Sequence, residues 1–363
     1  MSYEKYDIDA AIYQSFMGLA PRHVPHWEHW SDPDAETYLT GIDYYDHPQQ
    51  CRVKLRELYP ELRLAIPPTD DPKPRPMGDN TADNVVRWGD GQTGTFLHGE
   101  QFFKTEEDVF NFSPLAHADM REWGFVVENW DFRSEEAIEA RFEKIWPKPW
   151  KKPDPLSTDG VSFYNTTFMW PLLSFGWEMF LATCLDESFE RIMDEFAQIN
   201  RRVFSVYARL PIRFVICHDD IATTRGPVCS PSWMHKYVFP RYEEYWSMLK
   251  ASGKDVIFMA DGCVDQYVDD IMACGARGVI SEPYTNYKAI ARKYRDPFIA
   301  GEGDNRILMR NNPDEILSMV QSMAETAQMS GGYMMCIGNH IPWNVPGEAI
   351  KRYLDLSREL ARR

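Results

Sequence analysis

The chain has 363 residues, of which 44% are hydrophobic and 14% are aromatic, so it is long enough to bury a large core as a single α/β domain. Its net charge of −16 disfavours nucleic acid and anionic membranes as partners, and no apolar run approaches the ~20 residues of a membrane-spanning helix. The N-terminus shows no secretory signal and the seven cysteines form no CxxC pair, which indicates reduced thiols in a cytoplasmic protein.

The N-terminal part of the chain predicts short elements joined by loops. Residues 1–20 predict a leading helix, and the segment from His23 to His29 has the character of a strand. From Pro48 to Leu62 apolar residues recur at helical spacing. The other expectations here are a loop opened by Pro33 and Asp34, a hairpin over 84–103 with Asp90-Gly91 as its turn, and helices near 105–121 and 134–145.

The C-terminal part alternates strands with helices. A helix is expected from its N-cap Ser230 to its stop at Gly253. The other expected helices cover 173–208, 264–275, 286–294, 312–328 and 345–361. The expected strands cover 160–168, 213–220, 255–262, 276–283, 296–303 and 332–340.

This alternation with short connections is typical of parallel βαβ units, which build a barrel or a doubly wound sheet. No GxGxxG motif opens the first helix of any unit, and this disfavours a nucleotide-binding doubly wound sheet. We therefore predict an α/β fold, a single (β/α)8 TIM barrel over residues 1–363, with residues 1–20 as an N-terminal helical extension.

Polar residues close the expected strands. In a (β/α)8 barrel the active site lies at the C-terminal ends of the strands. Each such residue alone is equally consistent with a loop start or a helix cap, but a run of successive strands ending in acids indicates function. The series comprises Asp219, Asp220, Asp261, Glu282, Glu302, Asp304, Asn339 and His340, with His26, Glu28 and His29 from the early strand.

Metal binding is one chemistry that fits this series. Glu282, Glu302 and His340 are the predicted zinc ligands, with Asp261 as a fourth, because carboxylates and imidazole at a barrel mouth can leave a coordination position open for substrate. His23, His26 and His29 are spaced by three, but on a strand such positions point to opposite faces and share no metal.

Acid–base chemistry without a metal is the other chemistry that fits this series of polar residues. Asp219 and Asp220 follow His218 directly, and a carboxylate in an apolar mouth can donate a proton or hold a cation. Asp220 fits the cap of the next loop equally well. We predict catalytic roles for Asp219, Asp261 and His340, and substrate-binding roles for His26, His218, Asp220, Asn339 and Asp304.

Cysteines and aromatic residues near the same rim leave further alternatives open. Cys336 is expected in the core, whereas Cys263 fits either the core or a reactive thiolate. A surplus of aromatic residues fits a pocket for a flat or methylated ligand, or ordinary packing. These residues are Trp88, Phe96, Phe102, Phe103, Phe163, Tyr164, Phe168 and Trp170.

Four segments resemble the uroporphyrinogen decarboxylase superfamily. They are HDDIATTRGPVCSPSWMHKYVFPRYEEYW from His218, GKDVIFMADGCVDQYVDDIMACGARGVISEP from Gly253, GEGDNRIL from Gly301 and GNHIPWNVPGEAIKRYLDL from Gly338. The resemblance is good over roughly residues 160–360 and looser before them. It implies the barrel fold, and an activity of either a heme-pathway decarboxylase or a corrinoid-dependent methyltransferase.

Two departures from the family patterns narrow this choice. The decarboxylase motif R-Q-A-G-R is absent from residues 1–60, which argues against uroporphyrinogen itself as substrate. The zinc motif H-x-C-G of the coenzyme M enzymes, with its later cysteine, is replaced here by Met259, Asp261 and Asn339, which argues against thiol activation.

The resemblance therefore implies transfer of a methyl group from a small methoxylated or methylamine-type substrate to a corrinoid protein. No D-x-H-x-x-G corrinoid motif is present, so the cobalamin is expected on a separate partner protein. A homodimer is a further possible assembly. The alternatives are a decarboxylase of a non-heme substrate and a barrel that binds a small molecule without catalysis.

Overall fold

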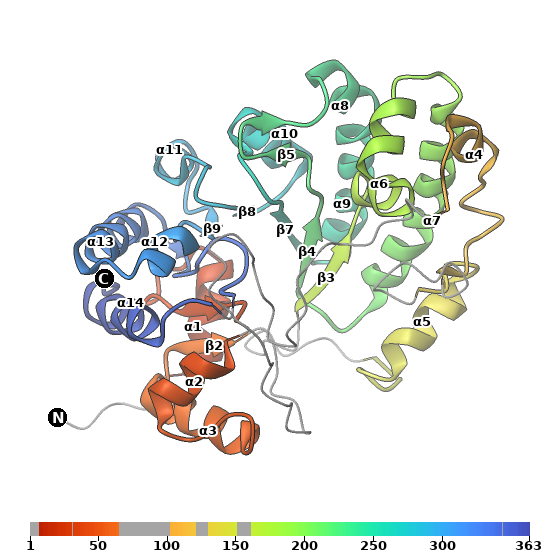
Figure 1. Ribbon diagram of the computed structural model, residues 1–363. Coiled ribbons are helices and arrows are strands. Elements are labelled where there is room, and N and C mark those ends of the chain that lie inside the picture. The colour runs from red at the N-terminus through yellow and green to blue at the C-terminus, as the bar shows by residue number, and fades with distance from the viewer. Residues whose placement is uncertain (1–6, 31, 65–101, 121–129, 151–160, 343) are drawn as a thin grey trace. The chain divides into compact units, whose positions relative to one another are not determined.

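The computed structural model describes residues 7–30, 32–64, 102–120, 130–150, 161–342 and 344–363, which form an α/β fold of parallel strands and helices (Figure 1). These residues divide into two units. The terminal unit takes Met1–Thr95 and Val279–Arg363, and the central unit takes Phe96–Gly278. The hairpin turn expected at Asp90-Gly91 lies outside the described residues. The expectation that residues 1–363 form a single domain stays a prediction.

The central unit is built on three parallel strands in the order β3 (Val161–Asn165), β4 (Phe214–His218) and β7 (Asp255–Met259). A short antiparallel pair, β5 (Ala222–Thr223) and β6 (Gly226–Pro227), follows β4. Its helices are α4 (Glu106–Asn111), α5 (Glu135–Glu143), α6 (Met169–Thr183), α7 (Phe189–Arg209), α8 (Pro231–Tyr237), α9 (Phe239–Ala251) and α10 (Val268–Cys274), with a 3-10 turn at Asp265–Tyr267.

The three strands have two different faces, because successive side chains on a strand alternate in direction. Tyr164, Cys217 and Phe258 stand in register on the helix face. There the Tyr164 hydroxyl donates to Asn200 of α7 over 2.6 Å, and the Phe258 ring lies 5.8 Å from Tyr242 of α9. Figure 1 shows α7 and α9 beside these strands. The other face, the site face, carries Phe163, Asn165, Ile216, His218, Ile257 and Met259.

The terminal unit joins the two ends of the chain, red to orange and blue in Figure 1. Strand β1 (His26–Glu28) pairs in parallel with β2 (Leu62–Leu64), and β10 (Gly332–Tyr333) pairs in parallel with β9 (Phe298–Ala300), which neighbours β8 (Gly278–Ile280). Parallel bridges join His26 to Met335, Trp30 to Ile341 and Gly303 to Ile337. Its helices are α1 (Ile8–Phe16), α2 (Pro33–Thr40), α3 (Pro48–Leu58), α11 (Tyr287–Lys293), α12 (Asn305–Arg310), α13 (Pro313–Met329) and α14 (Gly347–Leu360).

The parallel α/β fold that the sequence predicts is confirmed, and the local differences include a strand at 332–333 in place of 332–340 and a helix that ends at Asn111 in place of 121. Two further differences have a clear physical cause. Pro33 starts helix α2 instead of a loop, because Asp32 caps the helix through the Ala35 amide and a proline at the first helical position loses no hydrogen bond. The helix expected from Ser230 to Gly253 is broken at Val238, just before the α9 segment that carries Pro240 in its first turn. Within the described residues the strands do not trace a closed ring, so the barrel stays a prediction.

Close backbone packing at the end of β9 makes Gly301 a sensitive position. Its φ is +96°, and a Cβ atom there would lie 1.9 Å from the Ser281 carbonyl oxygen. We expect Gly301→Ala to lower the free energy of unfolding by about 3 kcal/mol or more in urea titrations, because strain and overlap add. Gly41→Ala is the matched control, since its φ is +72° but no atom lies within 4 Å of the added carbon, and about 1 kcal/mol is expected. Equal losses in both variants would contradict this account.

Candidate active site

The carboxyl ends of β3, β4 and β7 bring polar residues together on the site face of the central unit. Asn165, His218 and Met259 stand in one row across the three strands, with His218 in the middle. His218 Nδ1 lies 2.8 Å from Asn165 Oδ1, and His218 Nε2 lies 2.9 Å from Asp220 Oδ1. Both ring nitrogens therefore face oxygen acceptors, an arrangement that suits a doubly protonated imidazolium.

Electrostatics support a protonated His218. Burial alone lowers the pKa of this imidazole, but the neighbouring carboxylates, first Asp220, then Asp261 and Asp219, outweigh it and raise the pKa above 6.5. Burial would raise the pKa of Asp220, but the charge and hydrogen bond of His218 lower it instead. The side chains are 14% and 20% exposed, so the pair is partly open to a ligand. This environment therefore favours the protonated form of the His218 ring.

A titration of His218 tests this charge state. The raised pKa means that the contribution of His218 to stability is present below about pH 6.5 and is lost as pH rises through its folded pKa. The lowered pKa of Asp220 gives a contribution that is present above about 3.8 and lost as pH falls through its folded value. We expect NMR titration of the His218 ring to give a pKa above 6.5, and Asp220→Asn to lower it. An unchanged His218 pKa in Asp220→Asn would contradict the pairing.

The loop after β7 completes this cluster. The Asp261 backbone N–H donates to Asp220 Oδ1 over 2.8 Å, so the Asp220 carboxylate orients both His218 and the loop. Gly262 then turns with φ +80°, and a Cβ atom there would lie 2.6 Å from the Thr223 backbone. The Cys263 amide donates to the Thr223 carbonyl over 2.9 Å, and burial raises the pKa of the Cys263 thiol. A raised pKa favours the neutral thiol and disfavours the thiolate alternative.

Asp219 lies on the helix face. It is fully buried, and its carboxylate accepts hydrogen bonds from the backbone amides of Phe168 and Met169 at the start of α6. Thr166 Oγ1 and the Tyr242 hydroxyl also donate to it, over 2.7 and 2.6 Å. Burial raises the pKa of Asp219. The geometry favours an anchor for α6, and the catalytic role stays a prediction.

In the terminal unit, His340 packs against His29, with ring centroids 3.9 Å apart. Burial, and then the neighbouring His29, lower the pKa of His340 to about 3, so its imidazole is neutral at pH 7. Asn339 before it has a φ of +66°, and its side-chain amide lies 3.4 Å from Glu282 Oε1. Neutral His340 can accept but not donate a proton as an acid at neutral pH.

Asp304 and Glu302 point to helices of the same unit. Asp304 caps α12 through the Arg306 amide and forms an ion pair with the Arg306 guanidinium over 2.7 Å. Glu302 accepts from the Tyr333 hydroxyl over 2.8 Å and from Thr326 Oγ1 of α13 over 3.0 Å, while burial raises its pKa. Both carboxylates therefore have local structural partners.

His26 lies in a buried hydrogen-bond cluster of the terminal unit. His26 Nε2 is 2.6 Å from Glu28 Oε1 and 2.9 Å from the hydroxyl of Tyr353 on α14. The Glu28 carboxylate, which is fully buried, also accepts the Ile337 backbone N–H over 3.1 Å. With 2% of its surface exposed, His26 is placed to brace the segment before His340, and its substrate-binding role stays a prediction. Burial and the Glu28 charge raise the pKa of Cys336, although this residue is only partly buried and not a full member of the core as the sequence predicts.

The predicted zinc ligands are not brought into one cluster. Glu282 lies by Asn339, Glu302 by Tyr333 and Thr326, and His340 by His29. In the part of the chain that the structure describes, no group of three or more His, Cys, Asp or Glu side chains could hold a metal ion. Zinc binding therefore gains no support from the described side chains and stays a prediction, for which elemental analysis of the purified protein is the test.

Reading the strand ends missed three contributors: Asn165, Tyr242 and Tyr353. Asn165 ends β3 just as His218 ends β4, and its place at a strand end was the available signal. The two tyrosines come from helices, α9 and α14, and only the fold brings them to the acids that they contact.

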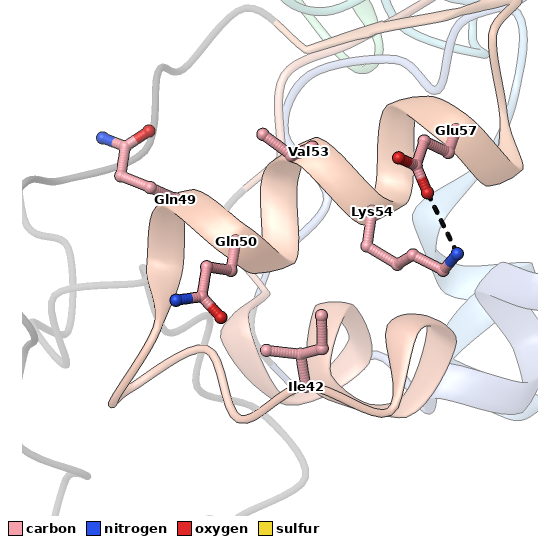
Figure 2. A pocket seen from close by; sticks show the side chains of 6 residues that line it. All are labelled: Ile42, Gln49, Gln50, Val53, Lys54 and Glu57. Carbon is pink, nitrogen blue, oxygen red and sulfur yellow. Dashed lines mark hydrogen bonds and ion pairs between the residues drawn. The ribbon is translucent and has the colours of Figure 1, made fainter.

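A shallow groove on the terminal unit is lined by none of the candidate residues. It has a volume of about 320 Å³ and lies on α3 (Figure 2). Ile42 and Val53 are its apolar lining residues, and the Lys54–Glu57 ion pair, 3.0 Å long, also lines it. The lining residues are Ile42, Gln49, Gln50, Val53, Lys54 and Glu57. None of them is a candidate catalytic residue.

Comparison with known proteins agrees with this fold. The chain is an α/β protein with polar residues at the carboxyl ends of parallel strands. Residues 180–360 match the family model described as uroporphyrinogen decarboxylase (URO-D). The resemblance seen in the sequence motifs is thereby confirmed.

Among solved structures, a methyltransferase from Methanosarcina mazei is similar in fold. Its TM-score is 0.57 at 15% sequence identity, and the alignment covers 98% of this chain and 99% of that chain. No curated protein matches the chain. Among the described helices, none combines the length and apolarity that crossing a bilayer requires.

Proposed function

We propose that this chain is a methyltransferase that moves a methyl group from a small methoxylated or methylamine-type substrate to a separate corrinoid protein. The observation that carries the proposal is His218, held between Asn165 and Asp220 with its pKa raised. The superfamily match and the fold of the methyltransferase from Methanosarcina mazei support an activity of this kind. The (β/α)8 barrel is part of the proposal.

The main chemical difficulty of ether demethylation is that the oxygen leaves poorly as an anion. An imidazolium removes this difficulty because it can protonate the leaving oxygen. In the proposed step the bond between the methyl carbon and the substrate heteroatom breaks, and cobalt(I) of the corrinoid protein supplies the electron pair of the new carbon–cobalt bond. The heteroatom keeps the old bonding pair and takes the Nδ1 proton of His218, replacing Asn165 Oδ1 as the partner of that ring nitrogen. General acid catalysis of this type contributes about 10²- to 10⁴-fold to a rate.

Asp220 and Asn165 are positioning residues in this proposal. Asp220 holds one ring nitrogen and Asn165 the other, so the imidazolium has one orientation at the strand ends. Asp261, Asn339 and His340 stay proposed site residues, and Glu282, Glu302, His26 and Asp304 stay predictions. No step is assigned to zinc, because the described donors do not converge on one point.

A decarboxylase of a non-heme substrate is the second candidate. The imidazolium could protonate the carbanion left by loss of carbon dioxide. Its surroundings argue against an anionic substrate, because Asp220, Asp261 and Asp219 all act on His218 electrostatically. A carboxylate substrate would meet like charges here.

The experiment incubates the purified chain with reduced cobalamin and with methoxylated or methylamine-type compounds. Formation of methylcobalamin, followed by its absorbance, is the expected result. Carbon dioxide release from carboxylic acids without cobalamin is measured in parallel. Absence of methylcobalamin with every compound overturns methyl transfer, and cobalt-independent carbon dioxide release supports the decarboxylase.

A further inference from the structure

One aromatic side chain of the site face is left open to solvent. Phe163 on β3 is 39% exposed, whereas Tyr164, its neighbour on the helix face, is fully buried. Most aromatic rings around this sheet pack against others in the core, such as Tyr164 with Phe204 and Phe258 with Tyr242. An exposed phenylalanine inside a cluster of polar site residues calls for a functional explanation more than one at a loop surface does.

The position of Phe163 connects it to the proposed proton donor. Its ring centroid lies 5.1 Å from that of His218, with an angle of 36° between the two planes. It stands on the same strand face as Asn165, two residues away. The backbone behind it is anchored, because the Tyr207 hydroxyl donates to the Phe163 carbonyl over 3.2 Å. A ligand ring packed on Phe163 therefore lies within reach of the His218 imidazole.

The chemistry of the leaving group narrows the substrate further. A methylammonium nitrogen leaves as a neutral amine and needs no proton, so an imidazolium would give its departure no help. Asp220 offers little to such a cation, because it is paired with His218. An ether oxygen does need a proton, and a flat apolar ring beside that oxygen matches the exposed face of Phe163.

We propose that Phe163 is a specificity-determining residue that stacks the ring of a neutral aryl methyl ether and places the ether oxygen beside His218. This inference rests on the proposed methyltransferase function and names the substrate class of that site. The ring is held by offset or edge contacts with Phe163, and the oxygen takes the proton on the side of the imidazolium.

The test compares methoxybenzene with methoxycyclohexane, which is similar in size but has no flat ring. Methylcobalamin formation gives kcat/KM for both compounds, with wild type, Phe163→Leu and the control Phe102→Leu, an exposed phenylalanine of the same unit. We expect Phe163→Leu to lower the ratio of methoxybenzene to methoxycyclohexane by about 2- to 12-fold, the range of an aromatic contact. Phe102→Leu is expected to leave the ratio unchanged. Using a ratio between variants removes the difference in leaving-group ability between the two ethers.

Two further measurements separate the inference from the proposed function. An unchanged ratio in Phe163→Leu, or faster transfer from tetramethylammonium than from methoxybenzene, overturns the inference while methyl transfer stands. If no compound yields methylcobalamin, calorimetric binding of methoxybenzene to the wild-type and Phe163→Leu chains decides the question of the aromatic platform by itself. Weaker binding to the variant supports the platform, and equal or undetectable binding to both overturns it.

Discussion

Replacing His218 with glutamine is expected to lower kcat/KM for methyl transfer by about 10²- to 10⁴-fold. Glutamine keeps hydrogen-bonding groups between Asn165 and Asp220 but carries no proton that it can give to a leaving oxygen. Because the pKa of His218 is raised, the wild-type rate is expected to fall as pH rises above this pKa. This falling limb of the pH–rate profile is expected to be absent in the variant. The measurement is kcat/KM for methylcobalamin formation across pH 5–9.

The matched control is His235→Gln, which changes a histidine of α8 in the same unit whose side chain is 56% exposed. It is expected to keep the wild-type rate and pH profile. Asp220→Asn should give an intermediate loss and shift the limb to lower pH, because the carboxylate that raises the His218 pKa is gone. A His218→Gln enzyme that keeps both rate and limb rules out His218 as the proton donor.

Much of the fold could be predicted from hydrophobic patterning alone. The segments that contain β3, β4 and β7 are short apolar runs followed by amphipathic helices, and such runs have few alternatives in an α/β chain. The start of α2 differs from the prediction because Pro33 and Asp34 predict a loop, although Asp32 before them is a favourable N-cap for a helix with proline at its first position. The break between α8 and α9 depends on Pro240, which breaks an otherwise continuous helical pattern.

The site was predicted less well, because a strand end says where a residue lies but not which way its side chain points. The residues Asp219 and Asp220 show this. The prediction gave Asp219 a catalytic role and Asp220 either a substrate-binding role or the cap of the next loop, whereas the structure places Asp219 at the start of α6 and Asp220 beside His218. The alternation of side chains along a strand predicts this difference in direction. His218 and Asp220 are two residues apart and point to the same side, whereas Asp219 points to the other.

The predicted zinc ligands lie apart in the described part of the chain for a related reason. Glu302 follows β9, but its carboxylate turns to Tyr333 and to Thr326 on α13. Those partners lie 31 and 24 residues away along the chain, so no local pattern shows that the carboxylate is already engaged. Where side chains from distant helices contact a strand end, the sequence predicts the position and the packing decides the role.

The second large effect concerns stability. Asp219→Ala is expected to lower the free energy of unfolding by about 3–5 kcal/mol, because it leaves buried amide and hydroxyl donors without an acceptor. These donors are the Phe168 and Met169 amides, Thr166 Oγ1 and the Tyr242 hydroxyl. The measurement is urea unfolding followed by circular dichroism.

Asp219→Asn separates the anchor role from the predicted catalytic role. Oδ1 accepts from the amides of Phe168 and Met169, while Oδ2 meets the hydroxyls of Thr166 and Tyr242, which can turn and accept from an asparagine NH2 group. The amide variant should therefore lose only about 1 kcal/mol of stability and keep methyl transfer within a few-fold of wild type. A folded Asp219→Asn enzyme slowed by about 10²-fold or more would instead give Asp219 a catalytic proton, since the isosteric amide preserves the anchor but cannot ionise.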